Sequence, residues 1–545
     1  MLAYIFQQSR RLLTAAAVAS TIHGFCNVLI LAQINKALTA PPGSLTLASA
    51  IQFGACALVA LLSQIIASIL SEHANQNVHT SLRRFIAHRV LSADYRHLEE
   101  TGAPRVQAAL TEHCSNLTEF LVGIPNIIVN IVTVLGCLAY LAWLSWQIFL
   151  VATLTIILGC LGYQVVGNRA SRHLEAAAQE QDRMFDHFRA LVDGAKELRL
   201  NAGKRRRFRD EVLDDSLQTY RREQLRGTSL YLVSSAWGGL LLYIFIGLVL
   251  YVLVGNVPDR AQVTTGFALV ILYMVPPLGE LLQELPRASQ ARVSHHHIQQ
   301  ITEQLQQHET DAHADAHAAP LLPPSSPGRI RLEGVCYRYY HEGKDEVFTL
   351  GPINLDLVPG QIIFLVGGNG SGKTSLAKLL VGLYKPAQGT ILLDGQPVND
   401  HNRDAYRQHF STIFADFHLF GQLLDQTSAA QDDKGNALLQ KLQLHHKVQV
   451  RRGAFTTRAL SQGQRKRLAL TITYLEDRPF LVFDEWAADQ DPVFKDVFYR
   501  QLLPGLRSQG KTVLVISHDD RYFDEADQII RMENGQIIGT EDHCH

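Results

Sequence analysis

A glycine-rich stretch in the second half of the chain reads Gly367-Gly368-Asn369-Gly370-Ser371-Gly372-Lys373-Thr374. It follows the apolar stretch Ile362–Val366, which predicts a buried strand, and it precedes residues at helical spacing that begin at Ser375. This GxxxxGK[ST] pattern between a strand and a helix is typical of a P-loop. Its glycines allow backbone N–H groups to surround phosphate oxygens, and the N-terminal end of the helix adds positive charge. Residues 367–375 are therefore expected to bind the phosphates of a nucleotide.

A second motif supplies the acids that phosphoryl transfer requires. The apolar stretch Phe480–Phe483 predicts a buried strand that ends in Asp484 and Glu485. We expect Lys373 to lie between the β and γ phosphates, and Thr374 and Asp484 to hold Mg²⁺. We expect Glu485 to orient and deprotonate the attacking water. Each motif alone also fits a simpler structure, either a glycine-rich turn or a strand capped by two solvated acids.

A third motif identifies the class of ATPase. Residues 460–464 read Leu-Ser-Gln-Gly-Gln, lie upstream of Asp484 and directly precede a predicted helix. This segment resembles the LSGGQ signature of ABC-type ATPases, with Gln462 in place of the first glycine. We expect Ser461 and Gly463 to offer a hydroxyl and backbone N–H groups to a γ-phosphate, with Gln464 beside them.

Three further residues match that family and extend the resemblance. Tyr339 matches the aromatic residue that stacks on adenine, His518 matches the switch histidine that contacts the γ-phosphate, and Asp491 matches the aspartate that follows the catalytic glutamate. The resemblance implies ATP hydrolysis with ATP and Mg²⁺ as cofactors. It also implies that two domains sandwich two ATP molecules, each P-loop facing the signature of the other copy. Because the chain carries one set of motifs, a homodimer is expected.

The chain before residue 285 is dominated by apolar segments. About 20 helical residues, at about 1.5 Å each, cross a hydrocarbon core of roughly 30 Å. A short turn around Ser145 joins the third and fourth segments into a tight hairpin. The six predicted membrane helices, none with Lys or Arg at its centre, run near Leu12–Ile34, Leu47–Leu70, Leu121–Leu144, Trp146–Val166, Leu230–Val254 and Val263–Leu282.

Two long, basic loops follow the second and fourth membrane segments. Together with Arg10 and Arg11, their charges place both loops and both termini in the cytoplasm. Apolar residues at helical spacing predict that the helices continue out of the membrane and reverse near Asp94–Gly102 and Asp186–Gly203. Each reversal presents a short helix suited to docking on a cytoplasmic domain; the simpler alternative is a solvated helix.

Composition limits the remaining function classes. The 545 residues carry a formal net charge of −1, which disfavours broad nucleic-acid binding. The seven cysteines show no CxxC spacing, so a disulfide framework or a structural zinc site is not expected. We predict a transmembrane domain at 1–300, a linker at 301–328 and a nucleotide-binding domain at 329–545. Histidines before and within this linker leave open whether it binds metal or is only solvated: His295, His296, His297, His308, His313 and His317.

The whole chain resembles an ABC exporter half-transporter: an all-α transmembrane domain with six helices, then an α/β P-loop ATPase domain. The stretches Asp484–Pro492, Ser517–Asp520 and Gly367–Gly372 are similar to the cyclic-peptide exporter family, which includes exporters of pyoverdine-type siderophore precursors and syringomycin-type lipopeptides. This resemblance implies ATP-driven export of a cyclic or non-ribosomal peptide across the bacterial inner membrane. Lipid or multidrug export, and an ATP-gated sensor or channel, are the alternatives.

The sequence departs from the family where the ATP site usually connects to the membrane domain. Family members carry Gln in a Q-x-x-x-L-F pattern, and counting back from Phe420 places Ala415 at that position. Asp416 either substitutes as a Mg²⁺ ligand or is a solvated acid.

Polar residues within the membrane segments bear on the cargo. Seven uncharged amides there suit a peptide-like or amphipathic cargo, and hydrogen bonding between helices is the alternative. Glu280 and Glu284 either bind cationic cargo or end the last span, and Pro276-Pro277 predicts a kink.

Overall fold

The computed structural model describes residues 2–41, 46–249, 251, 260–306, 328–341, 346–424 and 428–542. The chain divides into two compact units. The first comprises residues 1–88 and 104–302, and the second comprises residues 89–103 and 303–545. The predicted linker histidines at 308, 313 and 317 lie outside the described residues.

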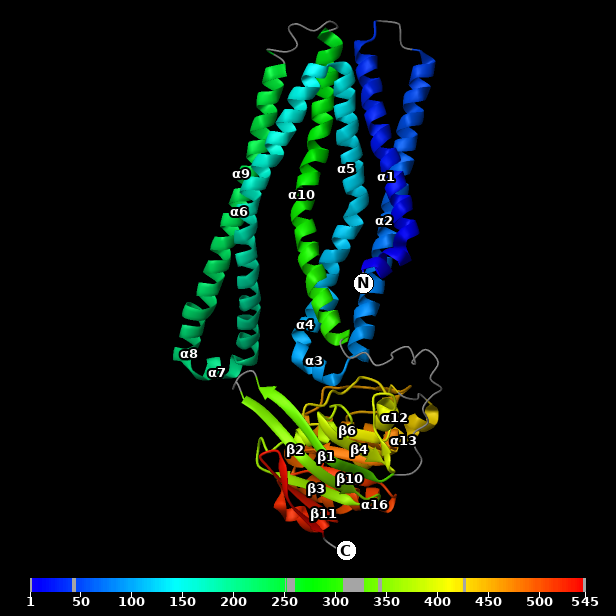
Figure 1. Cartoon of the computed structure of the whole chain (residues 1–545), viewed down its shortest axis with the longest axis vertical. Helices are drawn as coiled ribbons and strands as arrows, with labels where there is room; N and C mark the ends of the chain where they lie inside the picture. The colour runs from blue at the N-terminus through cyan, green and yellow to red at the C-terminus, as the bar shows by residue number, and fades with distance from the viewer. Residues whose placement is uncertain are drawn as a thin grey trace. The chain divides into compact units, whose positions relative to one another are not determined.

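The first unit is entirely helical in its described part (Figure 1). Six of its helical segments are long and apolar enough to cross a membrane, as predicted. Between the fourth and fifth spans, the chain reverses through two short helices; the first lies inside the predicted range 186–203, and the second begins within it and ends at Arg207. The elements are α1 (Leu2–Thr39), α2 (Leu47–Ser92), α4 (Ala103–Ala108), α5 (Cys114–Leu144), α6 (Trp146–Asp193), α7 (Ala195–Leu200), α8 (Ala202–Arg207), α9 (Asp214–Leu248) and α10 (Arg260–Gln306), with π-helical turns at Ala109–His113 and Phe208–Leu213.

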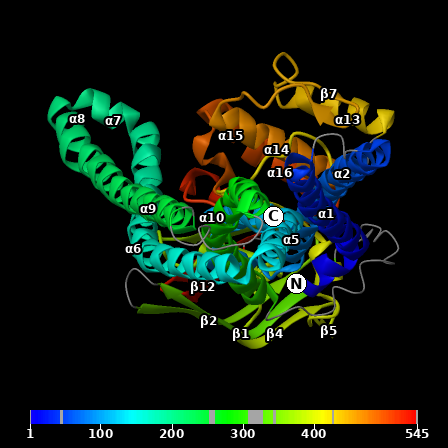
Figure 2. The same ribbon diagram turned by 90° about the horizontal axis from the view of Figure 1, so that it is seen from above.

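The sequence explains where these helices turn. Ser145 has an extended backbone, with φ −161° and ψ 119°, and it forms the whole connection between α5 and α6. At the other end of α6, Gly194 and Asn201 bracket α7, and the Asn201 side chain accepts a hydrogen bond from the backbone N–H of Lys204. As a result α6 and α9 run side by side over most of their length (Figure 2). The helix α10 continues through Pro276-Pro277 as one element.

Apolar packing and one polar junction hold the membrane helices together. Phe245 of α9 meets Phe267 of α10 edge to face, with ring centroids 5.4 Å apart, and both side chains are buried. Asn35 of α1 is fully buried; its Nδ2 donates to Tyr140 Oη at 2.8 Å, and its Oδ1 accepts from Thr265 Oγ1 at 2.9 Å. Because hydrocarbon offers no hydrogen-bond partner, such contacts fix three helices in register.

The second unit contains α3 (Tyr95–Thr101), two larger sheets and a short hairpin. The four-stranded sheet is antiparallel in the order β2-β1-β4-β5. The six-stranded sheet has the order β12-β11-β3-β10-β9-β6, with parallel pairing throughout except between β11 and β12. The strands are β1 (Ile330–His341), β2 (Glu346–Leu357), β3 (Ile362–Gly367), β4 (Gln388–Leu393), β5 (Gln396–Pro397), β6 (Phe410–Ile413), β7 (Val450–Arg451), β8 (Ala454–Phe455), β9 (Phe480–Asp484), β10 (Thr512–Ile516), β11 (Gln528–Glu533) and β12 (Gln536–Asp542).

The central strands of the six-stranded sheet are buried on both faces. Every residue of β9 and β10 is buried, which is why their sequences read as continuous apolar runs. Helices of this unit include α11 (Lys373–Leu380), α12 (Arg403–Arg407), α13 (Ala429–Lys441), α14 (Gln462–Glu476), α15 (Pro492–Val497) and α16 (Leu503–Ser508). The parallel strands β3, β9 and β10 end at one edge, where ligands bind in open α/β sheets. The fold class predicted from the sequence is confirmed.

Candidate active site

The P-loop connects β3 to α11 and depends on glycine at both ends. Gly367 has φ +155°, and a Cβ atom there would lie 2.2 Å from the carbonyl oxygen of Met532. Gly372 has φ +98° and directly precedes α11. A side chain is excluded at the first position by the neighbouring strand and is strained at the second by the left-handed backbone. Residues 368–370 are exposed, so their backbone is accessible to a ligand.

A cleft of about 550 Å³ lies against this loop. It is lined by P-loop residues 367–371 together with Ser517 and His518, which follow β10. The Ser371 side chain is buried, and its Oγ has no hydrogen-bond partner among the described residues. A buried hydroxyl without a partner is unfavourable unless a ligand satisfies it. The loop therefore fits an oxygen-rich anion such as a phosphate.

Lys373 is buried and holds the loop from inside. Its Nζ donates to the carbonyl oxygens of Gly367 and Gly368, both at 2.9 Å. Burial lowers the pKa of Lys373, and the negative charges of Glu485 and Asp484 act against that decrease. The ammonium is therefore positioned beside the loop, where β and γ phosphates would supply a stronger partner than two neutral carbonyls.

Thr374 and Asp484 meet at the carboxyl end of β9. Thr374 Oγ1 donates to Asp484 Oδ2 at 2.9 Å, and Asp484 is only 1% exposed. Burial raises the pKa of Asp484; the charges of Glu485 and Asp416 add to this increase, while Thr374 and Lys373 oppose it. A hydroxyl beside a buried carboxylate is the donor chemistry that Mg²⁺ prefers. Asp416 is exposed and close enough to act on Asp484 through its charge.

Glu485 and His518 lie next to each other at the same edge. His518 Nε2 is 3.3 Å from Glu485 Oε1, and each side chain is somewhat less than half exposed. Glu485 has φ +48°, which is strained for a residue with a side chain. Lys466 Nζ donates to the Glu485 carbonyl at 2.8 Å, and the Glu485 N–H donates to the Ile516 carbonyl at 3.1 Å. These two bonds hold the backbone in that strained conformation and aim the carboxylate.

The signature segment begins α14 and lies apart from the P-loop cluster. Ser461 and Gln464 form a capping box: Ser461 Oγ accepts from the Gln464 N–H, and Gln464 Oε1 accepts from the Ser461 N–H. A Cβ atom at Gly463 would lie 2.9 Å from the Asp489 carbonyl oxygen, which accounts for the glycine. Ser461 is exposed, and within the described chain no hydrogen bond or ion pair joins residues 461–464 to the P-loop.

Two other predicted residues have different surroundings. Asp491 caps α15: its Oδ1 accepts from the Phe494 N–H at 3.0 Å, and its Oδ2 accepts from Arg467 Nη2 at 2.6 Å. The backbone bond from Phe494 and the charge of Arg467 lower the pKa of Asp491. Tyr339 lies on β1 opposite Phe348, and its side chain is outside what the structure describes.

Sequence reasoning missed Lys466. It is 3% exposed, and its Nζ contacts both the Glu485 carbonyl and Asp489 Oδ2, the latter at 2.7 Å. In the sequence it stands between Arg465 and Arg467, and such a basic run is typical of a solvated helix face. The available signal was its position in the helix that follows the signature.

The structure gives hydrogen-bond or ion-pair partners to the two glutamates of the last membrane helix, Glu280 and Glu284. Asn130 Nδ2 donates to Glu280 Oε2 at 2.8 Å, and Asn126 Nδ2 donates to the same oxygen at 3.3 Å. Glu284 pairs with Arg287 at 2.6 Å. The two asparagines therefore bond one helix to another, which was the alternative to contact with cargo. Among the described residues, no three His, Cys, Asp or Glu side chains are grouped to hold a metal ion.

Comparison with known proteins agrees with this arrangement. Residues 350–488 match the ABC transporter family, and residues 12–275 match the ABC transporter transmembrane region. The ATP-binding protein SyrD of Pseudomonas syringae pv. syringae is 35% identical over 522 residues, which cover 95% of this chain and 92% of that protein. The ATP-dependent lipid A-core flippase of Ralstonia nicotianae is 25% identical over 528 residues, which cover 90% of this chain and 82% of the flippase.

A more limited similarity extends to a third transporter. The macrolide export ATP-binding/permease protein MacB of Shewanella oneidensis is 29% identical over 222 residues, which cover 38% of this chain and 33% of that protein. Three findings have one explanation: the grouping of the P-loop with the acids and the histidine, the six membrane-length helices, and the similarity along nearly the whole chain. The chain belongs to the ABC transporters, as an exporter-type half-transporter with one ATP-hydrolysing domain.

Proposed function

We propose that two copies of this chain form a homodimer in the bacterial inner membrane, with all termini in the cytoplasm, and export a cyclic or non-ribosomal peptide. The observation that carries the energy-coupling part is the grouping of Lys373, Thr374, Asp484, Glu485 and His518 at one sheet edge. The peptide cargo rests on the resemblance of the ATPase motifs to those of cyclic-peptide exporters.

In this mechanism the P-loop binds the β and γ phosphates of ATP through its backbone N–H groups and Lys373. Thr374 and Asp484 would hold Mg²⁺, which neutralises phosphate charge during transfer when it is bound. Glu485 orients the attacking water and accepts its proton. His518 contacts the γ-phosphate and, at 3.3 Å, keeps Glu485 beside it.

The second copy completes each site. Ser461 is exposed at the start of α14, and its hydrogen bonds among the described residues lie within its own segment, so its hydroxyl is accessible to a nucleotide held by the other copy. The copy that supplies Ser461 also supplies Gly463, Gln464 and Asp491 to this site. Tyr339 stacks on the adenine ring of ATP. Two composite sites then close on two ATP molecules.

Lipid or multidrug export is the second candidate. Several relatives are named lipid A-core flippases, and the membrane unit contains a largely apolar cavity, described below. The test uses the purified protein in lipid nanodiscs and compares ATP hydrolysis with a cyclic lipopeptide, a linear peptide or a lipid A precursor added. Stimulation by the lipopeptide alone supports the proposal, and stimulation by the lipid alone overturns its cargo part.

A transport assay separates export from gating. Inverted membrane vesicles should accumulate the stimulating cargo when ATP is added, and Glu485→Gln should abolish this uptake. Cargo movement that is equal in the wild type and in Glu485→Gln would show that ATP only opens a channel, and it would overturn export.

A further inference from the structure

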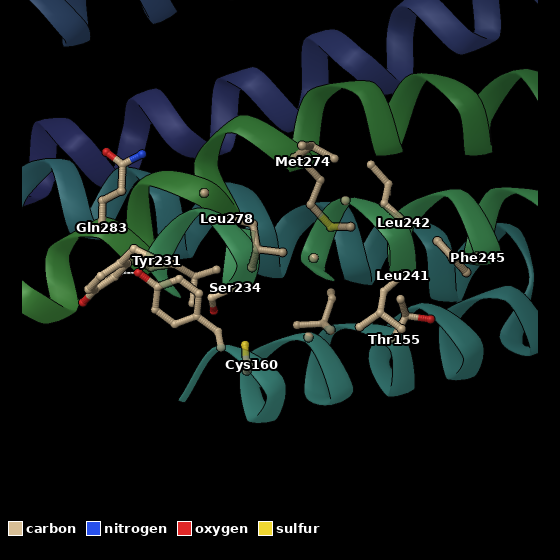
Figure 3. Close-up of a pocket in the computed structure, with 18 of the residues that line it drawn as sticks. Thr155, Cys160, Tyr231, Ser234, Leu241, Leu242, Phe245, Met274, Leu278 and Gln283 are labelled. Carbon is tan, nitrogen blue, oxygen red and sulfur yellow. Dashed lines mark hydrogen bonds between the residues drawn. The ribbon is translucent and has the colours of Figure 1, made fainter. Parts of the chain in front are cut away.

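The membrane unit encloses a cavity of about 530 Å³ between α6, α9 and α10 (Figure 3). This volume falls within the roughly 300–1,000 Å³ typical of small-molecule sites. Among the described residues that line the cavity, none is Asp, Glu, Lys, Arg or His. An occupant therefore carries no charge in the part that is enclosed, because a buried charge without a partner is strongly unfavourable.

Glycines on the surrounding helices create the space. Gly238 and Gly239 of α9 and Gly279 of α10 line the cavity, and a Cβ atom built at any of them would meet no atom within 4 Å. Gly162 of α6 is different, because a Cβ atom there would lie 2.3 Å from Trp237 Nε1. Glycine is a poor helix former, so it is expected where helices approach closely, as at Gly162. Gly238, Gly239 and Gly279 have no such packing role, and the space beside them is open to a ligand.

The two ends of the cavity differ chemically. Tyr231, Ser234 and Gln283 lie toward one end, whereas Leu242 and Phe245 lie toward the other (Figure 3). The lining therefore changes along the helices from groups that form hydrogen bonds to hydrocarbon.

Ser234 marks the polar end. It is 1% exposed, and its Oγ has no hydrogen-bond partner among the described residues. Thr155, by contrast, donates to the Val151 carbonyl at 2.8 Å, and Tyr163 donates to the Leu282 carbonyl at 3.3 Å. Within the described lining, Ser234 thus presents a buried hydroxyl that a ligand acceptor would satisfy.

We propose that this cavity binds one fatty-acyl chain, with the carbonyl of its neutral amide or ester linkage accepting a hydrogen bond from Ser234. The hydrocarbon then lies along Leu242, Phe245 and Met274, and the remainder of the molecule emerges near Gln283. This inference deepens the proposed function, on which it rests, by assigning an acyl group to the cargo. The same chemistry is available from an acylated peptide and from a bilayer lipid, and the experiment distinguishes these sources.

The test is photo-crosslinking of the full-length protein in nanodiscs without ATP. The probe is an N-acyl amino-acid amide with a diazirine near the end of its chain, and mass spectrometry locates the modified residues. Crosslinks should concentrate on the lining of α6, α9 and α10, including Met274 and Phe245. Crosslinks spread over the outer, lipid-facing helix surfaces overturn the proposal, as does absence of labelling because the second copy fills the space.

Matched glycine variants test the cavity itself. Gly239→Leu and Gly279→Leu should each lower labelling about tenfold, which corresponds to about 1.4 kcal/mol. Gly247→Leu is the control: Gly247 also lies on α9 with no atom within 4 Å of its ideal Cβ, but it does not line the cavity. Equal labelling in Gly239→Leu, Gly279→Leu and Gly247→Leu overturns the proposal. Monodispersity and melting temperature show whether each variant folds. If one of the two cavity variants fails to fold, the other still tests the proposal.

The polar contact and the source of the chain have separate tests. Ser234→Ala should weaken binding of the acyl amide about fivefold but leave a carbonyl-free alkyl diazirine unaffected; equal weakening of both overturns the Ser234 contact. Competition by an acylated cyclic peptide, but not by its deacylated form or by added phospholipid, identifies cargo, and competition by phospholipid alone identifies the bilayer lipid. Because binding is measured without ATP, failure of export leaves this result intact, and failure of labelling leaves export intact.

Discussion

Glu99 of α3 and Lys378 of α11 form an ion pair with Oε1 and Nζ 2.8 Å apart. Glu99 Oε2 also accepts from the Tyr384 hydroxyl at 2.5 Å, and the ring of Tyr95 lies 5.0 Å from the Lys378 ammonium. Burial lowers the pKa of Lys378, but the hydrogen bond to Glu99 and the charges of Glu99, Tyr95 and Asp416 together outweigh it, so this pKa is raised. Lys378 belongs to the same short helix as Lys373. The α3 segment is thereby linked to the helix that begins at the P-loop.

We predict that Glu99→Gln uncouples hydrolysis from cargo. The variant should retain basal ATP hydrolysis but lose most stimulation by cargo, because Lys378 keeps its charge and loses its carboxylate partner. Loss of about 1 kcal/mol would lower the melting temperature of a unit this size by about 2–4 °C. Glu100→Gln is the matched control, since Glu100 pairs with exposed Arg96 on the same helix. Unchanged stimulation in Glu99→Gln would contradict the link.

We predict that Glu485→Gln lowers ATP hydrolysis at least about 100-fold, because the amide cannot accept a proton from water. ATP affinity should remain, so the closed, ATP-bound dimer should accumulate, and this is measured as ATP retained by the purified protein. Glu525→Gln serves as the control, because Glu525 pairs with Arg500. Hydrolysis at the wild-type rate in Glu485→Gln would show that another group is the base.

Asp484 should make the stability of the nucleotide-free protein depend on pH. Its pKa is raised by burial above the ordinary 3.8, so the folded state holds the proton more tightly than the unfolded state. The Asp484 contribution therefore increasingly opposes folding as pH rises above 3.8, up to the folded-state pKa. Asp484→Asn should raise the melting temperature at pH 7, flatten this dependence and abolish stabilisation by Mg²⁺ with ATP. A lower melting temperature without nucleotide would contradict the sign.

Asp416 has two readings that a Mg²⁺ titration separates. If its carboxylate helps to hold the ion, Asp416→Asn should raise the Mg²⁺ concentration needed for half-maximal hydrolysis several-fold. If Asp416 is a solvated acid, the titration curve should not move. We expect the shift, because the Asp416 charge acts on Asp484.

Ala415→Gln should leave ATP affinity unchanged. A loss of ATP affinity in this variant would count against the alignment that counts back from Phe420.

Mixed dimers test whether the sites are composite. Lys373→Ala and Ser461→Arg should each abolish hydrolysis in a homodimer. A dimer with one copy of each variant regains one intact site, because the normal P-loop then faces the normal signature of the other copy. Two different affinity tags allow that dimer to be purified. If the P-loop and the signature acted within one copy, the mixed dimer would remain inactive.

The local patterns were predictable from the sequence, and the long-range pairs were not. The P-loop, the buried strand before Asp484 and six membrane-length helices follow from glycine spacing and apolar runs, and the structure has them. The contacts of Glu99 with Lys378 and of Lys466 with the Glu485 carbonyl join segments far apart in the chain, and no local period encodes them.

The glycines of the membrane helices show the same limit of prediction from the sequence. The sequence places glycine at 162 and at 239 in equally apolar surroundings. Only the arrangement of neighbouring helices shows that the first accommodates a tryptophan and that the second faces open space.

The exposed serine at the start of α14 has a consequence for cells. In the proposed homodimer, an inactive copy of this chain would pair with an intact copy and leave an ATP site of that copy incomplete. Cells that make both forms should lose more transport than the share of faulty chains. A damaged allele of this gene is therefore expected to behave as dominant.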